Sequence, residues 1–337
     1  MLNFDEERFV RIQSGAVAAG VGLRQTIVDL LEKGAENMFF LGAGGAGVLM
    51  TPAAQLLDRM SSFPAHVVHA AEIVVMPWNS LGPNSIVVVP SRSGTTEEAV
   101  TVLEFARKVG ATSIALTGHE DSPVAKLADH TIVNFVEDDT SSESFYVQSL
   151  LIALAIMQHR GEFSDYERVV AELQNLPESL VEAKRAFEER AAEIAGQIKD
   201  IDFHVISGAG GTWPEAWYYG TCILEEMQWI KTRPIHASDF FHGTLELIVE
   251  DTSVLLFKGE DEARPLVERV EAWAPTVSKR VAVLDTADCA LPGVSPDVRA
   301  MLSPVVLATW LERVNAHLEV LRNHPLTTRR YYRRLAY

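Results

Sequence analysis

The stretch Ser91-Arg92-Ser93-Gly94-Thr95-Thr96-Glu97-Glu98 joins an apolar segment, 85–90, to a segment with apolar residues at helical spacing, 99–109. This order predicts a buried strand, a turn and the start of a helix. The turn brings together a glycine and free backbone amides at the positive end of a helix dipole. It also offers the hydroxyl groups of Ser91, Ser93, Thr95 and Thr96. These donors together predict a cradle for a phosphate monoester.

A nucleotide P-loop and a purely structural turn are the alternatives to a phosphate cradle here. The P-loop is excluded, because the G-x-x-x-x-G-K-[ST] pattern is absent and the turn contains no lysine. A structural role remains open, in which Thr95 and Glu98 form a capping box and the serines only complete the turn. Four hydroxyl groups and a glycine nevertheless exceed what capping requires.

A glycine-rich turn occurs twice, each time between an apolar strand and a helix. Gly42-Ala43-Gly44-Gly45 follows the segment 37–41, and the same four residues return 166 positions later, at 208–211, after the segment 203–207. This matched recurrence predicts a duplicated α/β domain rather than a solenoid. A loose match to the dinucleotide fingerprint carries little weight, because no acidic residue stands clearly at the end of a second strand.

Strands and helices are expected to alternate in both halves, as in doubly wound parallel sheets. The first half is expected to contain strands at 65–69, 86–90, 113–117 and 131–135, and helices at 48–60, 96–109 and 122–128. Helical segments follow at 142–160, 164–173 and 178–199, with a break at Pro177. The second half is expected to contain strands at 252–257 and 279–284, and helices at 212–230, 260–273 and 304–321.

The fold class that results is α/β, with two tandem doubly wound parallel-sheet domains. The chain has 337 residues, which is long enough for two such domains. The expected divisions are a helical N-terminal arm at 1–34, a first domain at 35–160, a helical linker at 161–200, a second domain at 201–322 and a C-terminal tail at 323–337.

The composition narrows the classes of function. A hydrophobic content of 47% and a charged content of 22% are typical of a soluble globular protein, and the formal net charge of −17 argues against nucleic acid as a partner. Cys222 and Cys289 stand in no disulfide or metal-binding pattern, so we expect no metal and no other cofactor. The acidic start differs from a signal peptide, and no apolar run is long enough for a membrane helix. A cytoplasmic protein with no membrane partner is therefore expected.

Two glutamates lie in the largely apolar segment 212–230. Glu225 and Glu226 have apolar neighbours on both sides, so at least one of them should lie at the edge of an apolar surface. Desolvation there would raise the pKa of the carboxyl group and suit it to act as a general base near neutral pH. The plainer alternative is that both glutamates are solvated and take no part in chemistry.

His242 is another candidate for chemistry. It is followed by Gly243 at the start of a new apolar segment, where a lone histidine is usually a turn residue. The sequence pattern alone does not decide between these two roles.

The turn at 91–96 resembles the phosphate-binding loop of sugar isomerase (SIS) domains, which has the form S-x-S-G-x-T. The resemblance implies that Ser91, Ser93 and Thr96 bind the phosphate through their hydroxyl groups. Arg92, which replaces a glutamine often found there, would contribute its backbone amide. Tandem SIS domains also have the duplicated layout found above.

The resemblance includes further residues around a sugar. It implies weaker substrate contacts from Gly44 and Gly45 in the first glycine turn, and from Ser142. In this chain Gly45 and Ala46 stand where many SIS enzymes have a hydroxyl side chain, so one contact with the substrate is missing.

A glutamate and a histidine form the catalytic pair of SIS aminosugar isomerases and deglycases. In these enzymes the glutamate stands sixteen positions before the histidine of an H-G-P-L-E motif. Glu226 and His242 have this spacing, and the motif here is HGTLE, with Thr244 in place of the proline. The resemblance therefore favours Glu226 over Glu225.

The basic C-terminal segment resembles that of fructoselysine 6-phosphate deglycases, where it closes over the active site. The matching features are Asn-His-Pro at 323–325 and Arg-Arg-Tyr-Tyr at 329–332. They imply that Arg329, Arg330 and Tyr331 lie near the substrate. A disordered basic tail is the alternative. The lysine that aminosugar isomerases use for ring opening has no evident counterpart here, which weighs against a glutamine-type isomerase.

The whole resemblance implies a deglycase that acts on a small-molecule phosphosugar conjugate, a 6-phosphorylated ketosamine. It also implies a homodimer whose subunits share active sites. Three alternatives stay open: an aldose–ketose phosphosugar isomerase, a non-enzymatic phosphosugar sensor and an inactive scaffold. The sensor is disfavoured, because residues 1–36 are too short for the helix-turn-helix domain that SIS regulators carry.

Overall fold

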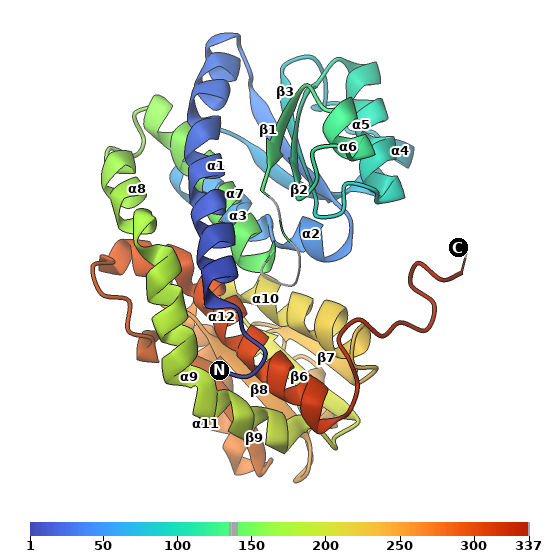
Figure 1. The fold of residues 1–337 in the computed structure, drawn as a ribbon, viewed down its shortest axis with the longest axis vertical. Coiled ribbons are helices and arrows are strands. Elements are labelled where there is room, and N and C mark those ends of the chain that lie inside the picture. The colour runs from blue at the N-terminus through green and yellow to red at the C-terminus, as the bar shows by residue number, and fades with distance from the viewer. Residues whose placement is uncertain (135, 137–140, 336–337) are drawn as a thin grey trace. The chain divides into compact units, whose positions relative to one another are not determined.

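The computed structural model describes the whole chain except residues 135, 137–140 and 336–337. The last residue of the expected strand 131–135 and the last two of the tail therefore lie outside the described residues. The chain forms two compact units, one of Glu7–Pro177 and the other of Met1–Glu6 together with Glu178–Tyr337. Each unit contains one sheet whose paired strands are all parallel (Figure 1). The predicted fold class is thus confirmed.

The first unit is a five-stranded sheet covered by helices. Its strands are β1 (Asn37–Gly42), β2 (Ala65–His69), β3 (Ser85–Ser91), β4 (Thr112–Thr117) and β5 (His130–Val133). Its helices are α1 (Glu6–Glu32), α2 (Gly44–Val48), α3 (Thr51–Met60), α4 (Ala70–Val75), α5 (Glu97–Val109), α6 (Pro123–Leu127), α7 (Ser141–His159) and α8 (Tyr166–Gln174). Figure 1 shows α4, α5 and α6 on one face of the sheet and α1, α3 and α7 on the other. Because helices cover both faces, β3 is buried along its entire length.

The strand order of this sheet, β2-β1-β3-β4-β5, places a topological switch point between β1 and β3. The chain leaves β1 toward β2 on one side, and β3 continues toward β4 on the other. Ligands of open α/β sheets bind in the crevice outside the carboxyl ends of the strands at such a point. The glycine turn after β1 and the hydroxyl-rich turn after β3 both lie at this edge. The sheet thus brings together two stretches that lie about fifty residues apart in the sequence.

The second unit has a four-stranded sheet in the order β7-β6-β8-β9. Its strands are β6 (Phe203–Gly208), β7 (Lys231–His236), β8 (Ser253–Lys258) and β9 (Arg280–Asp285). Its longer helices are α9 (Leu176–Ile198), α10 (Trp213–Tyr218), α11 (Arg264–Trp273) and α12 (Pro296–Leu321). Short 3₁₀ turns occupy Gly210–Thr212, Thr244–Leu247, Ala274–Thr276 and Thr286–Asp288, and a π-helix occupies Tyr219–Glu225. In the core, Val267 and Val270 of α11 join a buried cluster with Val205 and Val254 of the sheet.

The structure corrects several expected elements of the second unit. The segment 212–230 is not one helix, because α10 gives way to the π-helix Tyr219–Glu225. Strand β7 was not predicted, because its sequence, Lys-Thr-Arg-Pro-Ile-His, is largely polar and contains a proline. A proline is tolerated there because β7 is an edge strand, where one side of the backbone has no neighbour.

Prolines also account for the differences in the helices. The helical region is broken close to the expected position, at Asn175 between α8 and α9, and Pro177 lies in the first turn of α9, where its missing N–H is not needed. Helix α12 begins at Pro296 and passes through Pro304, at which the expected helix began.

The helices of the first unit differ from expectation in two places. Helix α4 was not predicted, and the expected helix 48–60 is divided into α2 and α3.

A buried ionic cluster joins α9, α12 and the N-terminal residues of the second unit. Arg313 is fully buried and donates from Nε to Glu188 Oε2 at 2.8 Å and from Nη2 to the Leu2 carbonyl at 2.5 Å. The Leu2 amide donates to Glu188 Oε1 at 2.8 Å, and the His317 ring lies 3.1 Å from the same oxygen. The Arg313 guanidinium also lies 5.3 Å from the centre of the Phe4 ring. One carboxylate therefore holds a buried cation and a segment of backbone together.

Candidate active site

The hydroxyl-rich turn lies between the end of β3 at Ser91 and the start of α5 at Glu97. The Ser91 and Thr96 hydroxyl oxygens are 3.2 Å apart and hydrogen bonded, so they lie side by side. Ser93 Oγ accepts from the amide and the hydroxyl of Thr95, at 3.3 and 3.0 Å. The three hydroxyl side chains predicted to bind phosphate thus belong to one tight turn, and Arg92 is exposed beside them.

The turn packs closely against the next strand and helix. Gly94 has a φ of +62°, and a Cβ atom there would lie 2.1 Å from Ser122 Oγ. The amide of Gly118 donates to the Arg92 carbonyl at 2.9 Å, and the amide of Val124 donates to the Gly94 carbonyl at 3.1 Å. The glycine is therefore required by both the backbone conformation and the packing, and the turn is held in one shape.

The structural alternative for this turn, a capping box of Thr95 and Glu98, is not formed. The residue that caps α5 is Thr96, and its side chain makes no capping hydrogen bond. The Thr95 hydroxyl bonds to Ser93 rather than to the start of the helix. The Thr96 side chain therefore does not cap the helix, and the positive end of α5 faces the turn.

The two glycine turns differ in what lies above them. Gly44 and Gly210 have similar φ angles, +53° and +55°, but a Cβ atom on Gly44 would meet nothing within 4 Å. A Cβ atom on Gly210 would lie 2.4 Å from a carboxylate oxygen of Asp261, which accepts from the Gly211 amide at 2.7 Å. Among the described residues, the first turn is thus open at Gly44, whereas the Asp261 side chain covers the second turn at Gly210.

Ser142 lies in the first turn of α7 and is buried. Its hydroxyl donates to Glu143 Oε2 at 3.3 Å. Glu143 is itself fully buried, although nothing in its sequence context singled it out. A buried acid in the first turn of a helix is stabilised by the helix dipole, so this part of α7 carries more polar groups than the sequence analysis indicated.

Glu226 follows directly on the π-helix Tyr219–Glu225 of the second unit. Its amide donates to the Thr221 carbonyl five residues earlier, at 3.2 Å, as does Gln228 to Ile223 at 3.1 Å. π-helical turns are rare and are found frequently at functional sites. The segment ends at Trp229, which has a φ of +58°, in the left-handed region that a bulky residue seldom adopts. An unusual backbone on both sides therefore sets the position of Glu226.

The two adjacent glutamates have different surroundings. Glu225 is exposed, and its Oε1 accepts from the amide and hydroxyl of Thr232 at 3.1 and 2.7 Å. Glu226 is 29% exposed, and its Oε1 accepts from Arg329 Nε at 2.9 Å. Glu225 therefore fastens the start of β7, whereas Glu226 faces the C-terminal tail.

A hollow of about 620 Å³ surrounds Glu226. It is lined by Glu225, Glu226, Trp229, Ile230, Lys231, Thr232, Arg329, Arg330, Tyr331 and Tyr332. The guanidinium of Arg330 lies 4.0 Å from the centre of the Trp229 ring. The structure thus brings Glu226 together with Arg329, Arg330 and Tyr331. Trp229 and Lys231 were missed by the sequence analysis, although they stand only three and five positions after the glutamate.

The start of the tail is fastened next to this hollow. Gln228 Nε2 donates to the His324 carbonyl at 2.7 Å, and the His324 ring packs edge-on against Trp229 with centres 4.5 Å apart. Asn323, with a φ of +47°, ends α12 in the left-handed conformation that Asn tolerates. The Asn-His-Pro motif therefore turns the chain from α12 toward Glu226.

His242 lies outside the set of residues that line the hollow. It is exposed in the single chain and precedes the 3₁₀ turn Thr244–Leu247. Thr244, which replaces the proline of the motif, is buried, and its hydroxyl accepts from Arg233 Nε at 2.9 Å. The segment after His242 is therefore anchored to β7, while the imidazole faces solvent.

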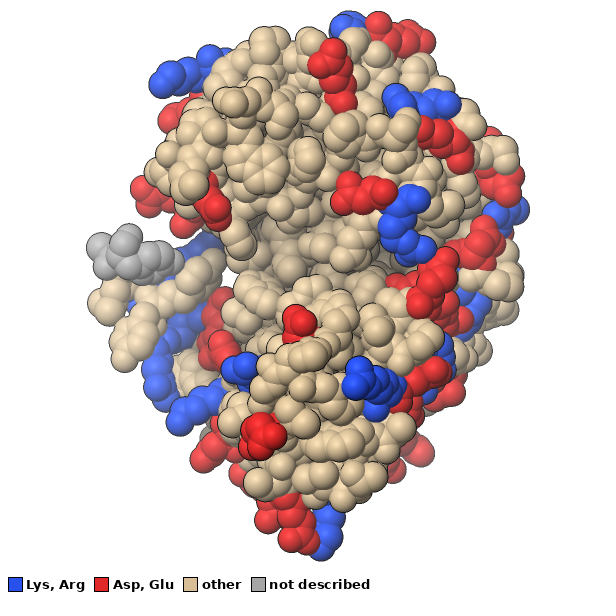
Figure 2. Space-filling view, turned by 180° about the vertical axis from the view of Figure 1, so that it is seen from behind, with Lys and Arg blue, Asp and Glu red and all other residues tan. Residues whose placement is uncertain are grey.

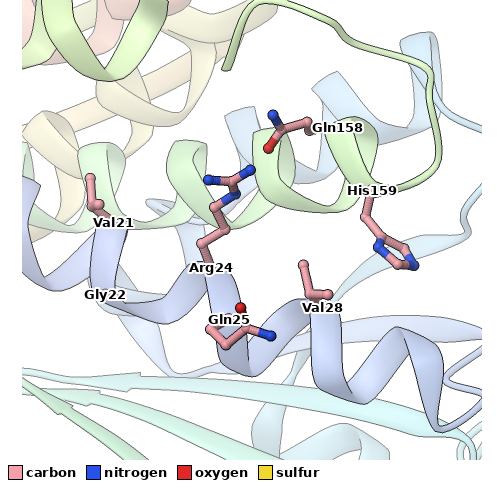
Figure 3. Close-up of a pocket in the computed structure, with 7 residues that line it drawn as sticks. All are labelled: Val21, Gly22, Arg24, Gln25, Val28, Gln158 and His159. Carbon is pink, nitrogen blue, oxygen red and sulfur yellow. The ribbon is translucent and has the colours of Figure 1, made fainter. Parts of the chain in front are cut away.

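A further hollow, of about 600 Å³, lies in the first unit between α1 and α7 (Figure 3). In it Arg24 extends from α1 toward α7 and pairs with Glu167 at 2.6 Å. None of the predicted site residues lines this hollow, so we assign no chemistry to it.

Metal sites and membrane-spanning helices are both absent from the described residues. These residues contain no group of three or more His, Cys, Asp or Glu side chains placed to hold a metal ion. Within the same residues, no helix is both long and apolar enough to cross a membrane.

The geometry of the hydroxyl-rich turn predicts the effect of removing its hydroxyl groups. We expect Ser93→Ala and Thr96→Val each to weaken the binding of glucose 6-phosphate about tenfold or more, because each would remove a hydroxyl group that the resemblance assigns to the phosphate. Titration calorimetry measures this directly, with Thr95→Ala as the matched control. Equal affinity in all three variants would show that the phosphate does not bind at this turn.

Comparison with known proteins places the chain among SIS proteins. Residues 33–158 match the SIS domain family. A fructosamine deglycase of Bacillus subtilis (strain 168) is 30% identical over 311 residues, which cover 92% of this chain and 95% of that protein. A fructoselysine 6-phosphate deglycase of Escherichia coli O157:H7 is 24% identical over 97% of this chain and 94% of its own length. A crystal structure from B. subtilis, described as that of a candidate phosphosugar isomerase, has a TM-score of 0.87 at 29% identity and covers 96% of this chain and 99% of its own.

Proposed function

This chain belongs to the SIS-domain family that contains the fructosamine deglycases, and from that premise we propose that it cleaves a 6-phosphorylated ketosamine into a sugar 6-phosphate and a free amine. The observation that carries the proposal is the placement of Glu226 in a hollow lined by cationic side chains. A base beside fixed positive charge suits a reaction that creates negative charge on a carbon chain.

In the proposed mechanism the turn after β3 holds the substrate by its phosphate. Ser91, Ser93 and Thr96 donate their hydroxyl hydrogens to phosphate oxygens, and the positive end of α5 favours the phosphate charge. The open backbone at Gly44 leaves space for the sugar beside the phosphate. Fixing the sugar in this way supplies orientation to the reacting carbon atoms.

The chemical steps are proton transfers followed by hydrolysis. The Glu226 carboxylate removes a proton from C1 of the ketosamine. The electrons of that C–H bond form a C1=C2 double bond, and the C2 carbonyl oxygen takes up a proton, which gives an enolamine. Return of the proton to C2 gives the Schiff base of an aldose. Water then adds to C1, and the C–N bond breaks to release the amine and the aldose 6-phosphate. His242 assists ring opening and proton movement on the sugar oxygens.

We also propose that the enzyme is a homodimer in which His242 of one chain serves Glu226 of its partner. The exposed imidazole and its absence from the hollow around Glu226, among the residues the structure describes, support this arrangement.

The proposal also includes the location and the domain boundaries of the protein. The enzyme is assigned to the cytoplasm. The SIS domains are assigned to 35–160 and 201–322, with an arm at 1–34, a linker at 161–200 and a tail at 323–337.

Subunit mixing tests the shared site. The variants Glu226→Gln and His242→Asn should each be inactive alone. Assembled together in equal amounts, they should recover about a quarter of the wild-type activity, because half of the dimers are mixed and each of those has one intact site. If the two inactive chains reassemble and no activity is recovered, both residues act within one chain.

The function itself is tested by product analysis. Incubation of the protein with fructoselysine 6-phosphate should release glucose 6-phosphate and lysine in equal amounts. Conversion of fructose 6-phosphate or glucosamine 6-phosphate, without release of amine from the conjugate, would instead identify an aldose–ketose isomerase. Binding of phosphosugars without any turnover would identify a non-enzymatic SIS protein.

A further inference from the structure

The tail places an arginine directly on the proposed base, with part of its guanidinium unoccupied. Arg329 Nε donates to Glu226 Oε1 at 2.9 Å, and Nη1 donates to the carbonyls of Leu326 and Thr328 at 2.5 and 3.0 Å. Among the residues that the structure describes, Nη2 makes no hydrogen bond. The side chain is only 16% exposed, so its direction is set by packing and by these three contacts.

The hollow at this Nη2 group has three cationic side chains and two carboxylates, Glu225 and Glu226, in its lining, on a chain with a formal net charge of −17. Lys231 and Arg330 also line the hollow. In the described part of the chain Lys231 makes no ion pair, and Arg330 is stacked on Trp229 rather than paired with an acid. Basic side chains gather along the C-terminal segment in Figure 2, whereas acidic side chains are spread over the rest of that face. The hollow beside Glu226 therefore suits an anionic group of a ligand.

We infer that Arg329 binds the carboxylate of the amino acid released, and so selects ketosamines formed on an α-amino group. This inference rests on the proposed deglycase function. Arg329 is then a specificity-determining residue. Its Nε holds Glu226 in place, and its Nη2 receives the carboxylate of the substrate.

The position of Arg329 next to the base decides between the possible linkages. In a conjugate formed through an α-amino group, only the nitrogen and the α-carbon separate C1 from the carboxylate carbon. The carboxylate can then reach Nη2 while the C1–H bond faces Glu226, because the two contacts come from one guanidinium. In a conjugate formed through the ε-amino group of lysine, the whole side chain lies between them, and the carboxylate passes beyond Arg329.

Two substrate pairs and a set of variants test the inference. The first pair is the Nα and Nε isomers of fructosyllysine 6-phosphate, which have the same composition. The second pair is fructosylglycine 6-phosphate and fructosylmethylamine 6-phosphate, which differ only in the carboxylate. Each is assayed for amine release with the wild type, Arg329→Gln, Arg329→Lys and Arg334→Gln. Arg334 is an exposed arginine of the tail outside the lining of the hollow, and so is the matched control.

The wild type and Arg334→Gln should favour the Nα isomer and the carboxylate-bearing conjugate by about 10- to 100-fold in kcat/KM, mostly through KM. Arg329→Gln should bring both ratios close to one, in addition to any loss common to all substrates. Arg329→Lys keeps the charge and should retain part of the preference, and it replaces Arg329→Gln if that variant does not fold.

Equal kcat/KM values within each pair for the wild type would overturn the inference while leaving the deglycase function intact. A uniform loss in Arg329→Gln, with both ratios unchanged, would also overturn it, because Arg329 would then act only on Glu226. Absence of amine release from every conjugate would instead contradict the proposed function on which the inference rests.

Discussion

Replacement of Glu226 by Gln is expected to lower amine release about 10²- to 10⁴-fold while leaving phosphosugar binding unchanged. The amide is similar in shape and can still contact Arg329, but it cannot accept a proton from C1. The phosphate turn belongs to the other compact unit and is unaffected by the substitution. Amine release gives the rate, and calorimetry with glucose 6-phosphate gives the affinity.

The neighbouring glutamate provides the matched control. Glu225→Gln keeps a carbonyl oxygen that can accept from the Thr232 amide and hydroxyl, so its rate should stay within a few fold of the wild type. If Glu225→Gln lost as much activity as Glu226→Gln, the assignment of the base to Glu226 would fail.

Replacement of Glu188 by Ala is expected to lower the free energy of unfolding by about 3–5 kcal/mol at neutral pH. Arg313 is fully buried, and the substitution removes its hydrogen-bonded counterion, leaving only the Glu312 carboxylate at 4.0 Å. The Leu2 amide also loses its acceptor. Denaturant titration measures the change, with the exposed neighbour Glu189→Ala as the control. A loss of unfolding free energy no larger than that of the control would show that the ionic cluster contributes little to stability.

The same cluster predicts a dependence of stability on pH. Burial alone would raise the pKa of Glu188, but hydrogen bonds from Arg313 and from the Leu2 amide, with the nearby positive charges, lower the pKa to about 2. Because this pKa is lower in the folded chain than in the unfolded chain, the stabilisation is present above about pH 4.5 and is lost as the pH falls toward 2. The difference in stability between the wild type and Glu188→Ala should therefore shrink over this interval.

Features set by neighbouring residues could be predicted from the sequence. The turn at 91–96 is local, and its strand, glycine and helix start are visible as a pattern of a few residues. The two glycine turns were likewise predicted from their flanking segments. The structure adds a difference between them: no described residue covers Gly44, whereas Gly210 is covered by the carboxylate of Asp261, about fifty residues away in the sequence.

Features that depend on distant residues could not be predicted in this way. The pair of Glu226 and Arg329 joins residues 103 positions apart, and only the resemblance of the tail to that of known deglycases suggested that the two lie close. Strand β7 has a polar sequence and is a strand because it pairs with β6. The π-helical turn was expected as an α-helix, because both have apolar residues at nearly the same spacing.

The π-helix before Glu226 makes the proposed active site sensitive to the length of the chain. A turn with hydrogen bonds between residues five apart holds one residue more than an α-helical turn. Loss of a single residue from Tyr219–Glu225 would let the segment close as a regular α-helix, which would rotate the following glutamate by about 100° about the helix axis. The phosphate turn, in the other unit, would be untouched. A one-codon deletion would therefore be a short evolutionary route from a catalyst to a protein that only binds phosphosugars.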